Sequence, residues 1–188
     1  MLGEKLGHVF DKPLEKLAAK IPLNPNTITV TGFLITLAGA YVLISDLRSG
    51  GLIVLAGGLF DMFDGIVARI NSKTTSFGAF LDSVLDRISD AIIFIAIALN
   101  LLNKTSYTGA LLATGTMVGA FLVSYTRARA EGLGKKCNVG LMERPERIIL
   151  ISFGAITGLI IMSLWVLVAL TWFTVFQRIF YVRTKLQE

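Results

Sequence analysis

Four aspartates are spaced so that their carboxylates could act together in one reactive site. Asp61 and Asp64 are three residues apart and Asp82 and Asp86 are four apart, each pair within an otherwise apolar stretch. On helices, these spacings place each pair on one face. The polar segment 71–76 predicts a turn between the two helices. If the helices fold back there, all four carboxylates can meet about 10 Å from the turn, at about 1.5 Å of rise per residue.

Such a cluster of negative charges in an apolar setting requires protons or cations to neutralise it. Carboxylate oxygens are hard ligands that suit Mg²⁺ or Mn²⁺, and four of them can hold two such ions. Two divalent ions close together stabilise phosphoryl transfer. The sequence therefore predicts a metal site at Asp61, Asp64, Asp82 and Asp86.

Small and basic residues beside the aspartates fit a ligand site. Gly65, Ala68 and Gly78 leave space for a ligand or another backbone to approach closely. Arg69 lies near the turn, where its planar guanidinium could hold a phosphate at two points. The alternative is a pair of buried, ion-paired helices with Arg69 as an anchor at the membrane surface. One or two nearby cations do not neutralise four acids, so we favour the ligand site.

Composition favours an integral helical membrane protein. The 188 residues are 54% hydrophobic and their mean hydropathy is +0.70. The first twenty residues are charged and lack the long apolar core of a cleavable signal. The net charge of +5 collects in short loops, which is typical of topology signals and anionic-lipid contacts rather than of nucleic-acid binding. His8 is the only histidine, which argues against a histidine-based metal site or a Ser-His triad.

The chain divides into an N-terminal segment and one membrane domain. Residues 1–22 alternate apolar and lysine faces at helical spacing, which predicts a juxtamembrane amphipathic helix; a disordered basic tail is the alternative. Within residues 23–188, the uncharged stretch 148–176 is too long for one span. We expect spans over about residues 28–44, 52–70, 77–102 and 108–128, and two short spans within 144–185 that are hinged between 157 and 165.

Six spans fit the distribution of lysines and arginines better than five spans do. They place the amino terminus, the 69–77 turn, the 127–147 loop and the carboxyl terminus on one side, which collects nearly all lysines and arginines. That side is the cytoplasmic one by the positive-inside rule. Five spans would send Arg178, Arg183 and Lys185 across the membrane. The expected fold is an all-α integral protein of the cell membrane, with six transmembrane helices and an N-terminal interfacial helix.

The aspartates belong to a longer pattern. Residues 61–86 read D-x-x-D-G-x-x-A-R, eight residues, then G-x-x-x-D-x-x-x-D. This resembles, at every fixed position, the signature of the CDP-alcohol phosphotransferases. The resemblance implies a homodimer, and six core helices around a cavity that opens to the cytoplasm. It also implies a CDP-lipid site made by Asn26, Thr27, Ile28, Thr29, Asp61, Gly65, Ala68, Arg69, Thr75 and Gly78.

Basic residues gather at the cytoplasmic ends of the last three helices. They are Arg127, Arg129, Lys135, Lys136, Arg144, Arg147 and Arg178. By themselves they fit either a topology signal or a phosphate pocket, since guanidinium groups bind phosphate at two points. The segments SYTRARAE and MERPERIIL, with DRISD and Gln177–Arg178, resemble the phosphatidylinositol-phosphate synthases and their archaeal archaetidylinositol-phosphate counterparts.

Enzymes of that branch transfer a phosphatidyl or archaetidyl group from CDP-diacylglycerol or CDP-archaeol to inositol phosphate and release CMP. The resemblance implies that Arg127, Arg147 and Arg178 bind the acceptor phosphate, with Arg129 and Arg144 as further candidates. We expect Asp86 to be the general base. Arg87 and Asp90, three apart, are expected to form an intrahelical ion pair that supports the acidic cluster.

Other functions are weighed against this one. Within the family, glycerol phosphate, serine or free inositol are alternative acceptors. A cation or proton transporter also buries acids, but it would not require glycines and an arginine at set spacing. A membrane prenyltransferase also uses two aspartate motifs and magnesium, but on well-separated helices of a longer chain. A structural scaffold has no use for four buried acids.

Overall fold

The described part of the chain is helical. The computed structural model describes residues 25–70 and 75–187, apart from the side chains of 25, 26 and 62–70. These residues form α2 (Pro25–Leu43), α3 (Leu47–Ile70), α4 (Ser76–Asn103), α5 (Tyr107–Gly132), α6 (Arg144–Thr157) and α7 (Ile160–Gln187). The amphipathic helix expected over residues 1–22 lies outside the described residues.

The start of α3 differs from the expectation. We placed it near residue 52, but the helix begins at Leu47. Asp46 caps it: the backbone N–H of Arg48 donates to Asp46 Oδ1 (3.0 Å) and that of Ser49 donates to Oδ2 (3.3 Å). Hydrogen bonds from the Ser49 side chain and from these two N–H groups lower the pKa of the Asp46 carboxyl. Capping therefore extends α3 through the polar residues that hydropathy assigned to a loop.

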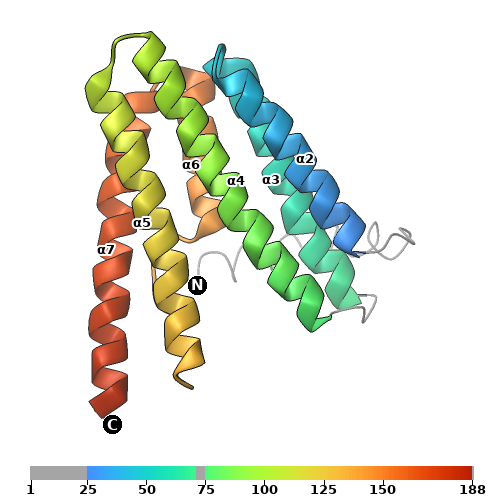
Figure 1. Cartoon of the computed structure of the whole chain (residues 1–188), viewed down its shortest axis with the longest axis vertical. Helices are drawn as coiled ribbons and strands as arrows, with labels where there is room; N and C mark the ends of the chain where they lie inside the picture. The colour runs from blue at the N-terminus through green and yellow to red at the C-terminus, as the bar shows by residue number, and fades with distance from the viewer. Residues whose placement is uncertain (1–24, 71–74, 188) are drawn as a thin grey trace.

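A short hinge separates the last two helices. α6 ends at Thr157, and Gly158 follows in the left-handed conformation (φ 81°), which glycine adopts at little cost. This hinge lies in the window that the sequence predicted. α6 has only 14 residues, or about 21 Å at 1.5 Å per residue. Figure 1 accordingly shows α6 in the upper part of the bundle, whereas α5 and α7 extend to the bottom of the view.

The helices that carry the acidic residues are held by other neighbours. Among the described residues, α3 packs mainly on α2 and α6, and α4 packs on α5 and α2. Figure 1 shows α2 and α3 on one side, α5 and α7 on the other, and α4 between them. α2 and α3 approach closely at Gly57, where an added Cβ would lie 2.3 Å from Thr36 Oγ1. The Asn100 amide of α4 donates to the carbonyl of Ile44, the residue after α2 (3.0 Å).

The surface and the core are both apolar. Ile97, Leu164 and Leu167 are fully buried, while large apolar side chains such as Tyr41, Leu111 and Met162 are exposed. By length and composition, the described helices α5 and α7 could cross a membrane. The expectation that all six helices do so stays a prediction.

Candidate active site

Aspartates from two helices, α3 and α4, converge in the structure. Asp61 of α3 lies opposite Asp82 and Asp86 of α4, and one carboxylate oxygen from each lies within 4.8 Å of the others. All three residues are half-buried. Asp64 follows one turn after Asp61 in α3, and its side chain lies outside the described part. The structure therefore brings together three of the four carboxylates that the sequence grouped.

This cluster fits a divalent cation. Its donors are carboxylate oxygens, the ligands that Mg²⁺ and Mn²⁺ prefer. Their separation is comparable to two metal–oxygen bonds of about 2.1 Å each. The cluster also attracts a positive group of the chain itself: Arg144 Nη1 contacts the carboxylates of Asp61 and Asp86. Asp61, Asp82 and Asp86 are therefore suited to hold a metal ion.

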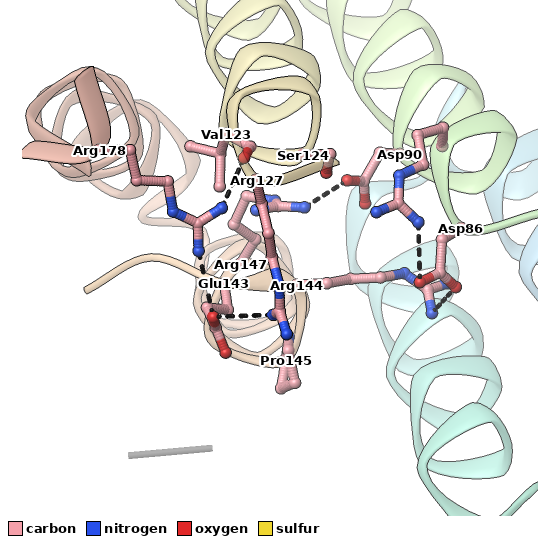
Figure 2. A pocket seen from close by; sticks show the side chains of 11 residues that line it. Asp86, Asp90, Val123, Ser124, Arg127, Glu143, Arg144, Pro145, Arg147 and Arg178 are labelled. Atoms are coloured by element: carbon pink, nitrogen blue, oxygen red, sulfur yellow. Dashed lines mark hydrogen bonds and ion pairs between the residues drawn. The ribbon is translucent and has the colours of Figure 1, made fainter. Parts of the chain in front are cut away.

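A cavity of about 200 Å³ adjoins the cluster (Figure 2). It lies where the short α6 begins, between α4, α5 and α7. Five arginines and three carboxylates line it, so its ionisable groups carry a net positive charge that suits an anion. The lining residues are Asp86, Arg87, Asp90, Val123, Ser124, Arg127, Glu143, Arg144, Pro145, Arg147 and Arg178. Four of the five arginines expected to bind the acceptor phosphate are among them.

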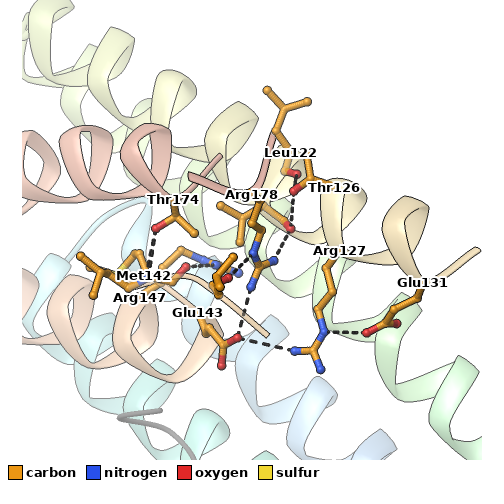
Figure 3. Close-up of polar contacts among 12 residues, drawn as sticks. Leu122, Thr126, Arg127, Glu131, Met142, Glu143, Arg147, Thr174 and Arg178 are labelled. Carbon is orange, nitrogen blue, oxygen red and sulfur yellow. Dashed lines mark hydrogen bonds and ion pairs between the residues drawn. The ribbon is translucent and has the colours of Figure 1, made fainter. Parts of the chain in front are cut away.

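Arg178 is fixed in this cavity by backbone carbonyls. Its Nε donates to the carbonyl of Val139 (2.7 Å) and its Nη1 to that of Val123 (2.5 Å). Its Nη2 donates to Glu143 Oε1 (3.2 Å), as Figure 3 shows. Arg178 is 2% exposed, so these bonds set its orientation. Gly140 permits the arrangement, since its φ is 143° and an added Cβ would lie 3.1 Å from Arg178 Nη2.

Asp90 forms an ion pair that the sequence did not indicate. Arg147 Nη2 donates to Asp90 Oδ2 (2.6 Å), while Arg147 Nη1 donates to the carbonyl of Met142 (3.2 Å). The expected Arg87–Asp90 pair is wrong, because Arg87 contacts Asp86 instead, at 3.6 Å. Asp90 faces α6 in the protein interior, whereas Arg87 stays at the surface. An acid in a mostly apolar helix signals the need for a partner, but spacing along one helix cannot identify a partner on another.

Arg129 lies apart from the other candidate arginines. It lines a separate cavity between the ends of α5 and α7, together with Leu133, Arg183 and Leu186. Two residues along a helix correspond to a rotation of about 200°, so Arg127 and Arg129 face opposite ways. The sequence also missed Glu143 and Ser124, which line the first cavity. Ser124 stands in SYTRARAE and Glu143 in MERPERIIL, but the resemblance of those segments implied roles only for their arginines.

The expected CDP-lipid residues are only partly described. At the start of α2, Thr27 is exposed while Ile28 and Thr29 are buried. Thr75 caps α4: its hydroxyl accepts from the backbone N–H of Gly78 (3.0 Å). The side chains of Asn26, Ala68 and Arg69, and the surroundings of Gly65, lie outside the described residues.

Related sequences match nearly the whole chain. An archaetidylinositol phosphate synthase of Methanothermobacter thermautotrophicus is 41% identical over 186 residues, which cover 95% of this chain and 93% of the relative. A phosphatidylinositol phosphate synthase of Corynebacterium glutamicum is 38% identical over 187 residues, covering 94% and 85%.

Solved structures agree in fold. The phosphatidylinositol phosphate synthase of Mycobacterium tuberculosis with CDP-DAG bound has a TM-score of 0.80 and 30% identity, covering 92% of this chain and 93% of its own. The same enzyme in complex with manganese and citrate also has a TM-score of 0.80, with 29% identity and coverage of 93% and 90%. Residues 23–180 match the family profile of the CDP-alcohol phosphatidyltransferases, and the chain belongs to that family.

Proposed function

We propose that this protein transfers the phosphatidyl or archaetidyl group of a CDP-linked lipid to inositol phosphate and releases CMP. The observation that carries this proposal is the position of a basic cavity directly beside the carboxylate cluster. A metal-binding cluster alone suits any member of the family. A phosphorylated acceptor additionally needs a cationic pocket next to the reacting centre. The named relatives support the same acceptor.

The reaction exchanges one phosphorus–oxygen bond for another. A hydroxyl oxygen of inositol phosphate bonds to the phosphorus that carries the lipid, and the bond from that phosphorus to the oxygen of CMP breaks. Asp86 takes the hydroxyl proton as general base. It lines the cavity and also belongs to the carboxylate cluster, so it stands between the acceptor and the site of transfer.

Two divalent ions, Mg²⁺ or Mn²⁺, complete the site in this proposal. Asp61, Asp64, Asp82 and Asp86 would hold them, and when bound they would neutralise negative charge on the pyrophosphate and on the departing CMP. The manganese complex of the mycobacterial relative supports a divalent ion at such a site.

The arginines position the acceptor. Arg127, Arg147 and Arg178 line one cavity and come from three different helices, so their guanidinium groups can surround a phosphate. Arg144, at the start of α6, lies between that cavity and the aspartates. The CDP-lipid would be bound by residues 26–29 and by Gly65, Ala68, Arg69, Thr75 and Gly78.

The surrounding protein would be a membrane domain of residues 23–188. In this proposal six helices cross the cell membrane, residues 1–22 lie along its surface, and the cavity opens to the cytoplasm. The arginines at the ends of α5 and α7 support this orientation through the positive-inside rule. The protein would act as a homodimer.

The proposal is tested by supplying purified protein with a CDP-lipid and a panel of radiolabelled alcohols. We expect label from inositol phosphate to enter the lipid fraction, and much less from serine, glycerol phosphate or free inositol. Running the panel with CDP-diacylglycerol and with CDP-archaeol identifies the lipid. Incorporation of serine or of free inositol in preference to inositol phosphate would reject the acceptor proposed here.

A further inference from the structure

Two consecutive residues at the start of α6 make opposite ionic contacts. Arg144 places its guanidinium on the carboxylates of Asp61 and Asp86. Glu143 places Oε1 between two guanidinium groups, 3.2 Å from Arg178 Nη2 and 3.5 Å from Arg127 Nη1 (Figure 3). One residue is thus a cation on an anionic cluster, and its neighbour is an anion in a cationic pocket.

Glu143 lies where an anionic ligand of these arginines would bind. Arg178 is oriented by the carbonyls of Val139 and Val123, and Arg127 by Glu131 (3.0 Å). These bonds leave one terminal nitrogen of each guanidinium directed at Glu143. A carboxylate oxygen between two guanidinium groups makes the charge-assisted contacts that a phosphate oxygen makes. A phosphate monoester, with a charge of about −1.5 to −2, would bind there more strongly than a carboxylate.

Arg144 competes in the same way with a divalent cation. It contacts the carboxylates of Asp61 and Asp86, two residues of the cluster that can hold the metal. A guanidinium carries a single charge spread over several atoms, whereas a divalent ion bonds directly to carboxylate oxygens at about 2.1 Å. Metal binding therefore requires Arg144 to leave the carboxylates. It then lies at the cavity with one unpaired positive charge.

We propose that Glu143 and Arg144 are internal stand-ins for the acceptor phosphate and the metal, and that they couple the binding of the two. Glu143 and Arg144 are adjacent at the N-terminal end of α6 and line the same cavity, so a change in charge beside one acts on the other. Arg144, released by the metal, can join Arg127 and Arg178 around a phosphate from which Glu143 has withdrawn. The metal thus strengthens acceptor binding, and by linkage the acceptor strengthens metal binding equally. This inference rests on the phosphorylated acceptor of the proposed function.

The test measures the binding of Mn²⁺ to the full-length protein in detergent by electron paramagnetic resonance. Binding is compared with and without inositol phosphate, and CDP-lipid is absent throughout. In the unaltered protein, inositol phosphate should lower the Mn²⁺ dissociation constant by roughly 5- to 150-fold, the usual range of such coupling. Arg144→Gln should bind Mn²⁺ more tightly without inositol phosphate, and should lose most of the coupling. Arg144→Lys keeps the charge and should lie between the two.

Glu143→Gln should bind inositol phosphate more tightly in the absence of metal, measured by calorimetry. Glu131→Gln is the matched control, since Glu131 also contacts Arg127 but does not contact Arg178. It removes the same charge without opening the bridged position, so it should change this affinity less. Weaker Mn²⁺ binding by both Arg144 variants, or weaker phosphate binding by Glu143→Gln, would mean that these contacts only hold the structure together, and would overturn the proposal.

A parallel turnover assay separates this proposal from the proposed function. If label from inositol phosphate enters lipid but inositol phosphate leaves Mn²⁺ affinity unchanged, the coupling is wrong and the function stands. If no label enters lipid while Arg144→Gln still tightens Mn²⁺ binding, the acceptor is wrong and the competition between Arg144 and metal stands. In that second case, the proposed coupling between inositol phosphate and metal is rejected together with the proposed acceptor.

Discussion

Arg147 of α6 donates to Asp90 of α4 across 2.6 Å, and the two residues are only 2% and 4% exposed. This buried ion pair joins the helix that begins at the cavity to the helix that carries Asp82 and Asp86. It also fixes one of the arginines proposed to hold the acceptor phosphate. In the proposed function, this one contact would therefore both stabilise the fold and position a residue that binds the acceptor phosphate.

Asp90→Leu should destabilise the protein strongly. The change leaves the Arg147 guanidinium buried without its carboxylate, and breaking a buried pair in this way costs about 3–5 kcal/mol. The double variant Asp90→Leu/Arg147→Met removes both charges and should recover much of that loss. Thermal unfolding of the purified variants measures both effects. A double variant no more stable than Asp90→Leu would contradict this account of the pair.

Asp86→Asn should abolish turnover while leaving CDP-lipid binding largely intact. Asparagine keeps the shape of the side chain but cannot accept the hydroxyl proton. Loss of a general base costs about 10²- to 10⁴-fold in rate. Turnover and CDP-lipid binding are measured on the same preparation, with Asp46→Asn as the control because Asp46 lies in the loop between α2 and α3. Unchanged turnover of Asp86→Asn would remove the base assignment.

Removal of divalent metal should stop the reaction. The carboxylates of Asp61, Asp82 and Asp86 would then have no cation to place against the pyrophosphate. We expect a chelator to abolish incorporation of label, and Mg²⁺ or Mn²⁺ to restore it. Activity that persists after exhaustive chelation would exclude the metal-dependent mechanism.

Arg127→Gln should raise the Michaelis constant of the acceptor more than Arg129→Gln does. Arg127 lines the cavity beside the aspartates, whereas Arg129 lines the separate cavity between the ends of α5 and α7. Losing one charge-assisted contact to phosphate costs about 1.5–3 kcal/mol, or roughly 10- to 150-fold. Steady-state kinetics with inositol phosphate at saturating CDP-lipid give the comparison. Equal effects of the two variants would mean that the acceptor phosphate reaches beyond the first cavity.

Gly50→Ala should destabilise the contact between α2 and α3. An added Cβ at Gly50 would lie 2.6 Å from the backbone nitrogen of Leu43 and 2.7 Å from its Cα, and backbone atoms cannot move aside as a side chain can. Overpacking of this kind costs about 1–3 kcal/mol. Gly132→Ala is the matched control, since nothing lies within 4 Å of the added atom. The midpoint of thermal unfolding should fall for Gly50→Ala and stay unchanged for Gly132→Ala.

Periodicity and spacing predicted much of this fold. The helices, the hinge at Gly158 and the approach of Asp61 to Asp82 and Asp86 all depend on residues near one another in sequence or on a helix pair joined by a short turn. The start of α3 at Leu47 was missed because hydropathy does not register the capping by Asp46.

Periodicity and spacing could not predict which side chains meet between helices that are far apart in the sequence. Asp90 and Arg147 are 57 residues apart, and their pairing depends on how α4 and α6 rotate about their own axes. The same is true of Glu143, which meets Arg178 only because the segment after α5 folds back onto α7. Amphipathic patterns indicate which face of a helix is buried, but they do not identify the neighbour that it meets.

The carboxylates that face each other across α3 and α4 have a practical consequence. Asp61 of α3 and Asp86 of α4 carry like charges and Arg144 bridges them, so a cation at the proposed metal site would also hold the two helices together. An ion that binds only the native fold stabilises it in proportion to the logarithm of its concentration. Buffers that contain a chelator should therefore lower the protein's thermal stability as well as its activity. Storage lifetime and crystallisation should depend on which divalent ion is supplied.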